Sequence, residues 1–262
     1  MYSVIEIISN SKAGGFALIV ILLGLWEILS QLAWVDPNYL PPVSIIALRL
    51  YELVKSLEIV HHLITTLKRV LLGYMLGASG GYILGFFCGY IPRIYHLFEL
   101  TIEFLRPMPS VALIPIGILF LGMGDALNVA IIGWACSWPV FINTMEGVRS
   151  TDRILINTAR TFGLNRMGII RKVIIPSALP FVFTGLRVGL GIAVAVVVIT
   201  EMVVSGSGLG FFIITTSISF RIPEMYAGII IIGLFGYILN RVFLEIDTKV
   251  LRWHKGFLSA GK

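Results

Sequence analysis

Residues 146–176 read EGVRSTDRILINTARTFGLNRMGIIRKVIIP, the longest strongly charged run in an otherwise apolar chain. Against Glu146 and Asp152, this run carries six basic residues: Arg149, Arg153, Arg160, Arg166, Arg171 and Lys172. Apolar residues recur with a helical period before Gly163 and again after it. Gly163 can adopt the left-handed backbone that ends one helix, and Asn165 can cap the next. We therefore predict two short helices joined at a glycine, in a loop between membrane spans.

The composition of the whole chain indicates a polytopic membrane protein. Of its 262 residues, 57% are hydrophobic and 13% charged, and the mean hydropathy is +0.94. Soluble domains carry about 25% charged residues. The net charge of +6 does not indicate nucleic-acid binding, because the basic residues flank apolar segments and no aromatic-plus-basic motif is present. Cys88 and Cys136 lie in apolar spans, where we expect buried side chains and neither a disulfide nor a metal site.

The hydropathy pattern predicts an all-α protein with about six transmembrane helices. The expected spans are residues 13–34, 63–91, a third from about 94 to 121, 126–144, 178–204 and 225–244. The first is long enough to cross a hydrocarbon core of about 30 Å, and its length and Glu27 favour a retained span over a cleaved signal peptide. Residues 41–62 have the amphipathic pattern of a helix lying in the membrane interface. The expected division is 1–40, 41–62, a core of 63–250 with the loop 146–176, and a tail of 251–262.

Two patterns within the spans predict their packing. Glycines recur at every fourth position of the second span, which leaves one helix face without side chains: Gly73, Gly77, Gly81, Gly85 and Gly89. A neighbouring helix can approach that face closely, either as a static packing surface or as a moving seam. Pro107, Pro109 and Pro115 interrupt the third span and predict a kink or break, which membranes tolerate only against protein or a water-filled cavity. Residues 205–220 are expected to form a re-entrant or surface-lying turn.

The 146–176 run resembles the EAA loop of ABC importer permeases. That pattern is E-A-A, three residues, Gly, nine residues, then I-x-L-P. The matching positions here are Asn157, Thr158, Ala159, Gly163, Val173, Ile175 and Pro176. Asn157 and Thr158 depart from the E-A pair. The flanking stretches PSALPFVFTGLRVGLGIA (176–193) and RPMPSVALIPIGILFLGMG (106–124) are similar to the nitrate, sulfonate, taurine and bicarbonate branch of that family.

The resemblance implies a type I ABC importer-like permease fold with cytoplasmic coupling helices. It implies that this subunit forms the translocation path for a small anion. A second permease copy, homodimeric or closely related, would complete that path. Separate ATPase subunits, which bind ATP and magnesium, would grip the loop, and a periplasmic or lipid-anchored binding protein would deliver the solute. No cofactor is expected in this chain.

The sequence contains no recognisable catalytic constellation. A G-x4-G-K-[ST] phosphate loop, H-E-x-x-H and paired C-x-x-C are all missing, so neither ATP hydrolysis nor metal chemistry is expected of this chain. The adjacent His61 and His62 are expected at the interface rather than on a metal. The alternative to an ABC permease is a self-contained secondary transporter, whose coupling-ion site would need intramembrane carboxylates such as Glu27 and Glu201.

Charges inside the spans are the candidate path residues. A charge at the bilayer centre costs about 2.5–3.5 kcal/mol on insertion scales, so it faces protein or water. Arg106 lies beside the proline breaks and Arg187 lies between Gly185 and Gly189. Either arginine could line an anion path, or could snorkel or pair with Glu99 or Glu103. Glu201 is expected near the outer gate, as a structural partner rather than an anion ligand.

The distribution of basic residues predicts the orientation. With six spans, both termini and the 146–176 loop share one side, which holds twelve basic residues against five on the other: Arg49, Lys55, Lys68, Arg69 and Arg221. The positive-inside rule then makes the loop and both termini cytoplasmic. The expected location is a bacterial inner membrane.

Overall fold

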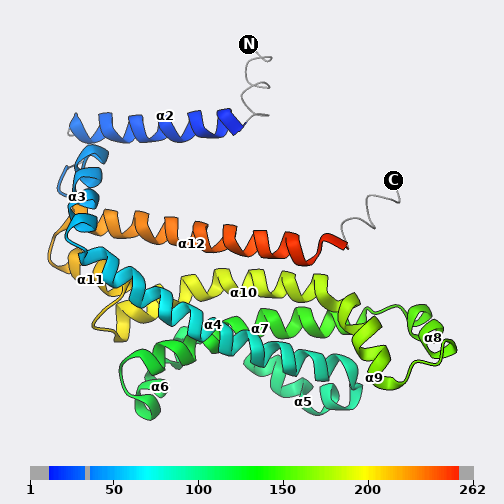
Figure 1. Cartoon of the computed structure of the whole chain (residues 1–262). Coiled ribbons are helices and arrows are strands. Elements are labelled where there is room, and N and C mark those ends of the chain that lie inside the picture. Colours follow the sequence, from blue (N-terminus) through cyan, green and yellow to red (C-terminus); the bar gives the residue numbers. More distant parts are fainter. Residues whose placement is uncertain (1–11, 33–35, 254–262) are drawn as a thin grey trace. The chain divides into compact units, whose positions relative to one another are not determined.

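The computed structural model describes residues 12–32 and 36–253, and all regular elements within these ranges are helical. Figure 1 shows the helices, coloured along the sequence. The chain divides into two compact units. Unit 1 comprises the described residues up to His62 together with Phe212–Ile232. Unit 2 comprises Leu63–Phe211 and the described residues from Gly233 onward. Each unit is described by itself.

In unit 1, polar contacts hold the corner between α2 (Lys12–Gln31) and α3 (Val43–Lys55). The indole of Trp26 donates to the Pro41 carbonyl over 3.1 Å. The Glu27 carboxylate accepts from the backbone N–H of Ser44 at 3.1 Å and from its hydroxyl at 2.7 Å. Glu27 thereby satisfies an orphan donor in the first turn of α3, where a negative charge is favourable. This agrees with the expectation that α3 begins a separate amphipathic segment.

The residues expected to form the interfacial segment, 41–62, contain the end of one helix and the start of the next. α3 ends at Lys55, and Leu57 has a left-handed backbone with φ of 61°. α4 then runs without interruption from Glu58 to Tyr90, whereas hydropathy placed its start near residue 63. The first turn of α4 carries Glu58, His61 and His62, which hide the helical start from a hydropathy pattern.

Unit 2 is built on α4, α7 (Asp125–Arg149) and α10 (Ile175–Val204). Its core consists of buried aliphatic side chains from these helices, with Phe235 from α12 (Ile222–Val250): Val70, Leu127, Ile131, Ile132, Ala193, Val196 and Val197 are among them. α12 also contacts α10 where the rings of Phe183 and Phe243 lie 6.0 Å apart. The core thus lies along the length of the α7–α10 pair.

The glycine face of α4 packs directly on the backbone of α7. A Cβ added to each glycine in turn would meet α7 atoms: Ile132 for Gly73, the Gly133 carbonyl for Gly77, the Ser137 carbonyl for Gly81, the Phe141 carbonyl for Gly85 and the Met145 carbonyl for Gly89. The predicted close approach is confirmed over the whole ridge. Such contacts leave no space between the two helices, which favours a fixed packing surface over a moving seam.

The predicted break in the third span is confirmed. α5 (Pro92–Leu105) is followed by a short 3-10 turn (Ser110–Leu113) and α6 (Ile114–Leu121), and the two parts are bent by 90°. Pro107 and Pro109 lie in the break, because neither can donate to a continuing helix. Gly122 and Gly124, with φ of 69° and 140°, make the turn into α7.

Among the residues that the structure describes, four helical segments are long and apolar enough to cross a membrane: Glu58–Tyr90, Asp125–Arg149, Arg166–Val204 and Ile222–Val250. The bent α5–α6 pair makes a fifth if it counts as one span. The first of the six expected spans corresponds to α2, and Ala17–Gln31 is its apolar stretch among the residues whose side chains the structure describes. The glycine-rich segment at 205–220, which we expected to form a re-entrant or surface-lying turn, contains a short helix, α11 (Leu209–Ile218).

We predict that Gly81→Ala destabilises the protein by about 1–3 kcal/mol, because the new methyl group must displace the α7 backbone. Gly80→Ala is the matched control, since a Cβ at Gly80 meets no atom within 4 Å. Thermal unfolding of the detergent-purified protein measures the difference. Equal midpoints for the two variants would contradict close packing at this face.

Candidate coupling loop and buried polar network

The predicted pair of short helices around Gly163 is confirmed. α8 (Arg153–Thr161) begins after Asp152, whose carboxylate accepts from the Ile154 N–H at 2.8 Å. α9 (Arg166–Ile169) begins after Asn165, whose side-chain oxygen accepts from the Gly168 N–H at 2.7 Å. A π-helical turn (Ile170–Ile174) then leads into α10. We call residues 150–176 the coupling loop.

Gly163 ends α8 with a left-handed residue, as the sequence predicts. Its φ is 76°, and its N–H donates to the Arg160 carbonyl at 2.9 Å. The Leu164 N–H donates to the Ala159 carbonyl at 3.1 Å, and Leu164 packs against the buried Ala159. These two bonds form a Schellman motif with its hydrophobic contact. A Cβ at Gly163 would meet no atom within 4 Å. Glycine is therefore favoured here by its positive φ and not by lack of space.

The coupling loop exposes apolar side chains rather than burying them. Ile154, Phe162 and Met167 are 71%, 79% and 54% exposed, while Ala159 and Ile169 face the core. Beside them lies a groove of about 420 Å³, lined by Leu155, Thr158, Ala159, Phe162, Leu164, Lys172, Val173, Pro176, Ser177 and Trp253. Of the residues matched to the EAA pattern, Thr158, Ala159, Val173 and Pro176 line this groove. Asn157 is exposed and Ile175 is half-buried.

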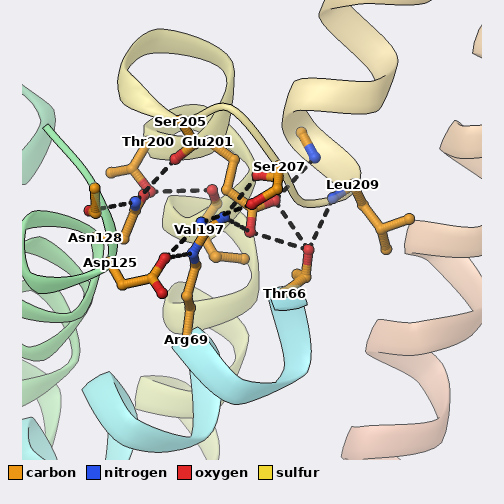
Figure 2. A network of polar contacts seen from close by, with 12 residues as sticks. Thr66, Arg69, Asp125, Asn128, Val197, Thr200, Glu201, Ser205, Ser207 and Leu209 are labelled. Carbon is orange, nitrogen blue, oxygen red and sulfur yellow. Dashed lines mark hydrogen bonds and ion pairs between the residues drawn. The ribbon is translucent and has the colours of Figure 1, made fainter. Parts of the chain in front are cut away.

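A buried arginine on α4 forms a polar network with three other segments (Figure 2). Arg69 is 5% exposed, and one of its terminal nitrogens lies 2.9 Å from the Glu201 carboxylate. Its other two nitrogens donate to Asp125, from Nε at 2.7 Å and from the second terminal nitrogen at 2.6 Å. The guanidinium also donates to the Ser207 carbonyl at 2.7 Å and to the Ser207 hydroxyl at 3.1 Å. Every nitrogen of the fork therefore has an acceptor on α7, α10 or the loop before α11.

Glu201 also accepts hydrogen bonds from Thr66 on α4 and from the first turn of α11. Its side chain is fully buried, and the Thr66 hydroxyl donates to both of its oxygens at 3.0 and 2.9 Å. The Gly210 N–H donates to it at 2.9 Å, and the Leu209 N–H donates to the Thr66 hydroxyl at 2.8 Å. The Glu201 carboxylate therefore lies at the first turn of α11, where the helix dipole favours a negative charge. Full hydrogen bonding of this kind is what a buried ion pair requires.

The loop before α11 fits around the Glu201 carboxylate. Gly208 has φ of 104°, and a Cβ there would overlap the carboxylate itself. Beside it, the Asn128 amide donates to the Gly124 carbonyl at 2.8 Å and to the Ser205 hydroxyl at 2.9 Å. Figure 2 shows these residues converging from α4, α7, α10 and the 205–208 loop. Gly208 and Gly210 thus allow close approach to Glu201, and the described chain gives this segment no strand–helix context of a nucleotide site.

The three predicted path residues lie apart. Glu201 is enclosed in the network, which favours the structural role over contact with solute. Arg106 caps the end of α5 and is exposed. Arg187 is exposed on α10, while Gly185 and Gly189 face the α7 backbone as expected. Neither arginine has a side-chain hydrogen bond or ion pair with another residue that the structure describes, so the expected pairing with Glu99 or Glu103 is not formed in this conformation.

Arg69 is the residue that the sequence pattern misplaces. The pattern puts it among the outer-side charges near the interfacial helix, whereas its side chain is buried within the bundle. A helical signal is available in the sequence, because Thr66, Arg69 and Gly73 continue the glycine face of α4 toward its start. Cys88 and Cys136 are buried, as expected of small side chains in apolar spans. Among the described residues, no group of three or more His, Cys, Asp or Glu side chains could hold a metal ion.

An all-helical bundle with several membrane-length helices, a proline-broken span and a basic loop that exposes apolar side chains is typical of a membrane transport component. Residues 81–251 match the family described as "Binding-protein-dependent transport system inner membrane component". The chain belongs to this family, whose members are the permease subunits of ABC importers. It is a multi-pass inner membrane protein that works with an ATPase and a binding protein, and the ATPase activity and its cofactors reside in a separate subunit. This assignment excludes the alternative of a self-contained secondary transporter.

Several relatives match most of the chain. It is 31% identical to the putative aliphatic sulfonates transport permease SsuC of Bacillus subtilis, over 93% of this chain and 88% of that protein. It is 27% identical to the taurine transport permease TauC of Escherichia coli, over 90% and 88%. It is 31% identical to the nitrate import permease NrtB of Leptolyngbya laminosa, over 71% and 67%.

The solved structures with the same fold are ABC transporters. The inward-facing MetNI methionine ABC transporter has a TM-score of 0.62 at 19% identity, covering 73% of this chain and 95% of that chain. An amino acid ABC transporter with histidines has a TM-score of 0.58 at 24% identity, covering 77% and 97%. At these identities the likeness concerns the fold alone. It confirms the predicted permease architecture.

We predict that Arg69→Leu destabilises the protein by about 3–5 kcal/mol, because it leaves Glu201 buried without its cation. Glu201→Leu should cost a similar amount by leaving the guanidinium with Asp125 alone. The Arg69→Leu/Glu201→Leu double variant should be destabilised by less than the sum of the single changes, since neither charge is then orphaned. Unfolding of the four proteins in one detergent measures this cycle. Additive effects would contradict a coupled ion pair.

Proposed function

We propose that this permease imports a small solute with negatively charged oxygen atoms, such as a sulfonate, taurine or nitrate. The observation that carries the proposal is the agreement among relatives: SsuC, TauC and NrtB are named for aliphatic sulfonates, taurine and nitrate. All three solutes present charged oxygens with planar or tetrahedral geometry. An arginine can bind such oxygens with two parallel hydrogen bonds and keeps its charge in this setting.

We place the translocation path on the exposed face of α10. Arg187 lies on the opposite side of the helix from Gly185 and Gly189, which pack on α7. The same side carries an exposed stripe of small and aliphatic residues: Thr184, Val188, Gly191, Ala195 and Ile199. A Cβ at Gly191 would meet no atom within 4 Å, so this face is open in the single chain. A second permease copy facing this stripe would enclose a path with one Arg187 from each side.

The ATPase subunit is proposed to dock on the coupling loop, with the apolar side chains Ile154, Phe162 and Met167 covered by the partner. Exposed apolar side chains beside a groove are typical of a protein interface, and the surrounding arginines supply a charged rim. The coupling loop and the buried polar network lie at opposite ends of α7 and α10 (Figure 1). We propose that these packed helices carry the movement of the loop to the network end as one block.

The orientation follows from this docking and from the charge distribution. The ATPase works in the cytoplasm, so the coupling loop and the end of α12 face that side. The polar network then faces the binding protein. The basic residues of the loop and of the described tail agree with this orientation.

We predict that Arg187→Gln abolishes or strongly reduces ATP-driven uptake of the anion by proteoliposomes that contain permease, ATPase and binding protein. Arg187→Lys should retain part of the activity, because it keeps the charge but loses the bidentate geometry. Arg106→Gln, at the other exposed intramembrane arginine, is tested in parallel. ATPase binding should be unchanged in all variants. If Arg187→Gln and Arg106→Gln both import sulfonate, taurine and nitrate normally, neither arginine lines the path.

We predict that Gly163→Val weakens ATPase binding, because a β-branched residue at φ of 76° is strained by about 1 kcal/mol or more. Gly163→Asn is the matched control, since asparagine tolerates the left-handed region and should keep binding and transport close to normal. Co-purification of the ATPase with each variant gives the comparison. Full binding and transport by Gly163→Val would rule out the proposed role of this turn.

A further inference from the structure

A polar pocket lies beside the coupling loop, separate from the groove proposed for the ATPase. Its volume is about 530 Å³, and it is lined by Gly89, Tyr90, Pro92, Tyr95, His96, Val148, Arg149, Thr151, Arg153, Ile156 and Ile174. These residues come from the end of α4, the start of α5, the end of α7 and the start of α8. The pocket is therefore at the coupling-loop end of unit 2. We call it the basic pocket.

The basic pocket contains positive charge without a matching carboxylate. The Arg149 guanidinium stacks 4.0 Å above the Tyr95 ring, and one of its nitrogens donates to the Cys88 carbonyl at 3.5 Å. Arg153 has no hydrogen bond or ion pair with another described residue. The carboxylates nearby are turned to other partners: Asp152 caps α8, and Glu99 lies 3.3 Å from His96. Two arginines facing one cavity without a counter-ion attract an anion.

The rest of the lining suits a phosphate in particular. Phosphate oxygens take several donors at once, and guanidinium groups match them with paired hydrogen bonds. The Tyr90 and Tyr95 phenols and the Thr151 hydroxyl add neutral polar groups. α5 begins in the pocket without a side-chain cap, so the positive end of its dipole adds to the field.

A second, apolar cavity is lined by residues of α4, α5 and α7, the helices that also line the basic pocket. It holds about 270 Å³ and is lined by Gly81, Leu84, Phe87, Cys88, Ile94, Phe98, Thr101, Ile102, Leu105, Trp134, Ser137, Trp138 and Phe141. Cys88 and Gly89 are neighbours on α4, as are Ile94 and Tyr95 on α5, and each pair places one residue in each cavity. A basic cavity at the membrane surface and an apolar cavity below it fit a molecule with an anionic head and a hydrocarbon tail.

We propose that the basic pocket binds the phosphate of an anionic phospholipid, with one acyl chain in the apolar cavity. Tyrosines and arginines at this depth are typical of a helix bundle that meets lipid headgroups, and basic pockets between membrane helices bind such headgroups. In the proposed orientation the lipid belongs to the cytoplasmic leaflet. Because Ile156 and the start of α8 also line the pocket, the lipid would lie directly behind the coupling helix.

The first experiment measures lipid retention by the purified permease complex in mixed phosphatidylglycerol and phosphatidylcholine, using native mass spectrometry. Phosphatidylglycerol should be retained preferentially. Arg149→Gln and Arg153→Gln should each lower its retention roughly fivefold, the equivalent of about 1 kcal/mol per basic residue near the surface. Arg171→Gln removes the same charge from an exposed loop position outside the pocket and should change nothing. Arg149→Lys keeps the charge and should retain the lipid, which serves as the test if the Gln variant does not fold.

The second experiment separates a lipid from free phosphate. Thr101→Trp places a large side chain in the apolar cavity and should reduce retention of phosphatidylglycerol, while inorganic phosphate or glycerol phosphate at equal concentration should not displace it. The lipid assignment is overturned if inorganic phosphate binds with the same dependence on Arg149 and Thr101→Trp has no effect. No preference over phosphatidylcholine, or an equal loss in Arg171→Gln, overturns the site altogether. Retention is measured without solute or ATP, so either failure leaves the proposed import function standing.

Discussion

The close approach of the α4 and α7 backbones is the constraint on which unit 2 depends. In a bilayer the hydrophobic effect does not drive helices together, because lipid tails are as apolar as leucine, so association depends on packing and internal hydrogen bonds. Glycine at every turn of α4 from Gly73 to Gly89 meets that requirement by exposing backbone to backbone, and Gly147 and Gly185 do the same between α7 and α10. Three helices held this closely have no room to slide. They form the frame from which the coupling loop projects at one end.

At the other end of these three helices, the buried Arg69–Glu201 ion pair connects α4 to α10. Glycine contacts fix how near the helices lie, but they specify little about register. A buried charge pair with donors from Thr66 and Gly210 can be satisfied in one arrangement only, because a shifted register would leave a charge unpaired in the bundle. The network also ties the first turn of α11 to the frame. The two ends of unit 2 thus differ in character: one exposes the apolar side chains of the coupling loop, and at the other the charges of Arg69 and Glu201 are paired and hydrogen-bonded within the chain.

Local features were predictable from the sequence, and long-range pairings were not. Gly163, Asn165 and the proline break after Arg106 act through their own backbone chemistry, so residue type and spacing were sufficient. The glycine ridge of α4 could also be predicted, because residues at every fourth position fall on one face of a helix. Arg69 was misplaced because its partner Glu201 is far along the chain, and hydropathy alone cannot separate a buried paired arginine from one at the interface. The apolar residues of α8 show the same limit, since an amphipathic pattern does not say whether the face meets this chain's own core or another protein.

The proposed rigid connection between the coupling loop and the network end can be measured directly. Spin labels are placed at two exposed positions, Arg160 on α8 and Ala126 at the far end of α7. Labelled chain is diluted with unlabelled chain, so that the measured label-to-label distance lies within one copy of the permease. Distances are compared in the assembled transporter without nucleotide and with ATP bound. If the coupling loop and the packed helices move as one rigid block, the Arg160–Ala126 distance distribution is unchanged on ATP binding while the transporter switches state. A shift of that distribution would show that the coupling loop moves independently of the packed helices, and would contradict transmission through a rigid block.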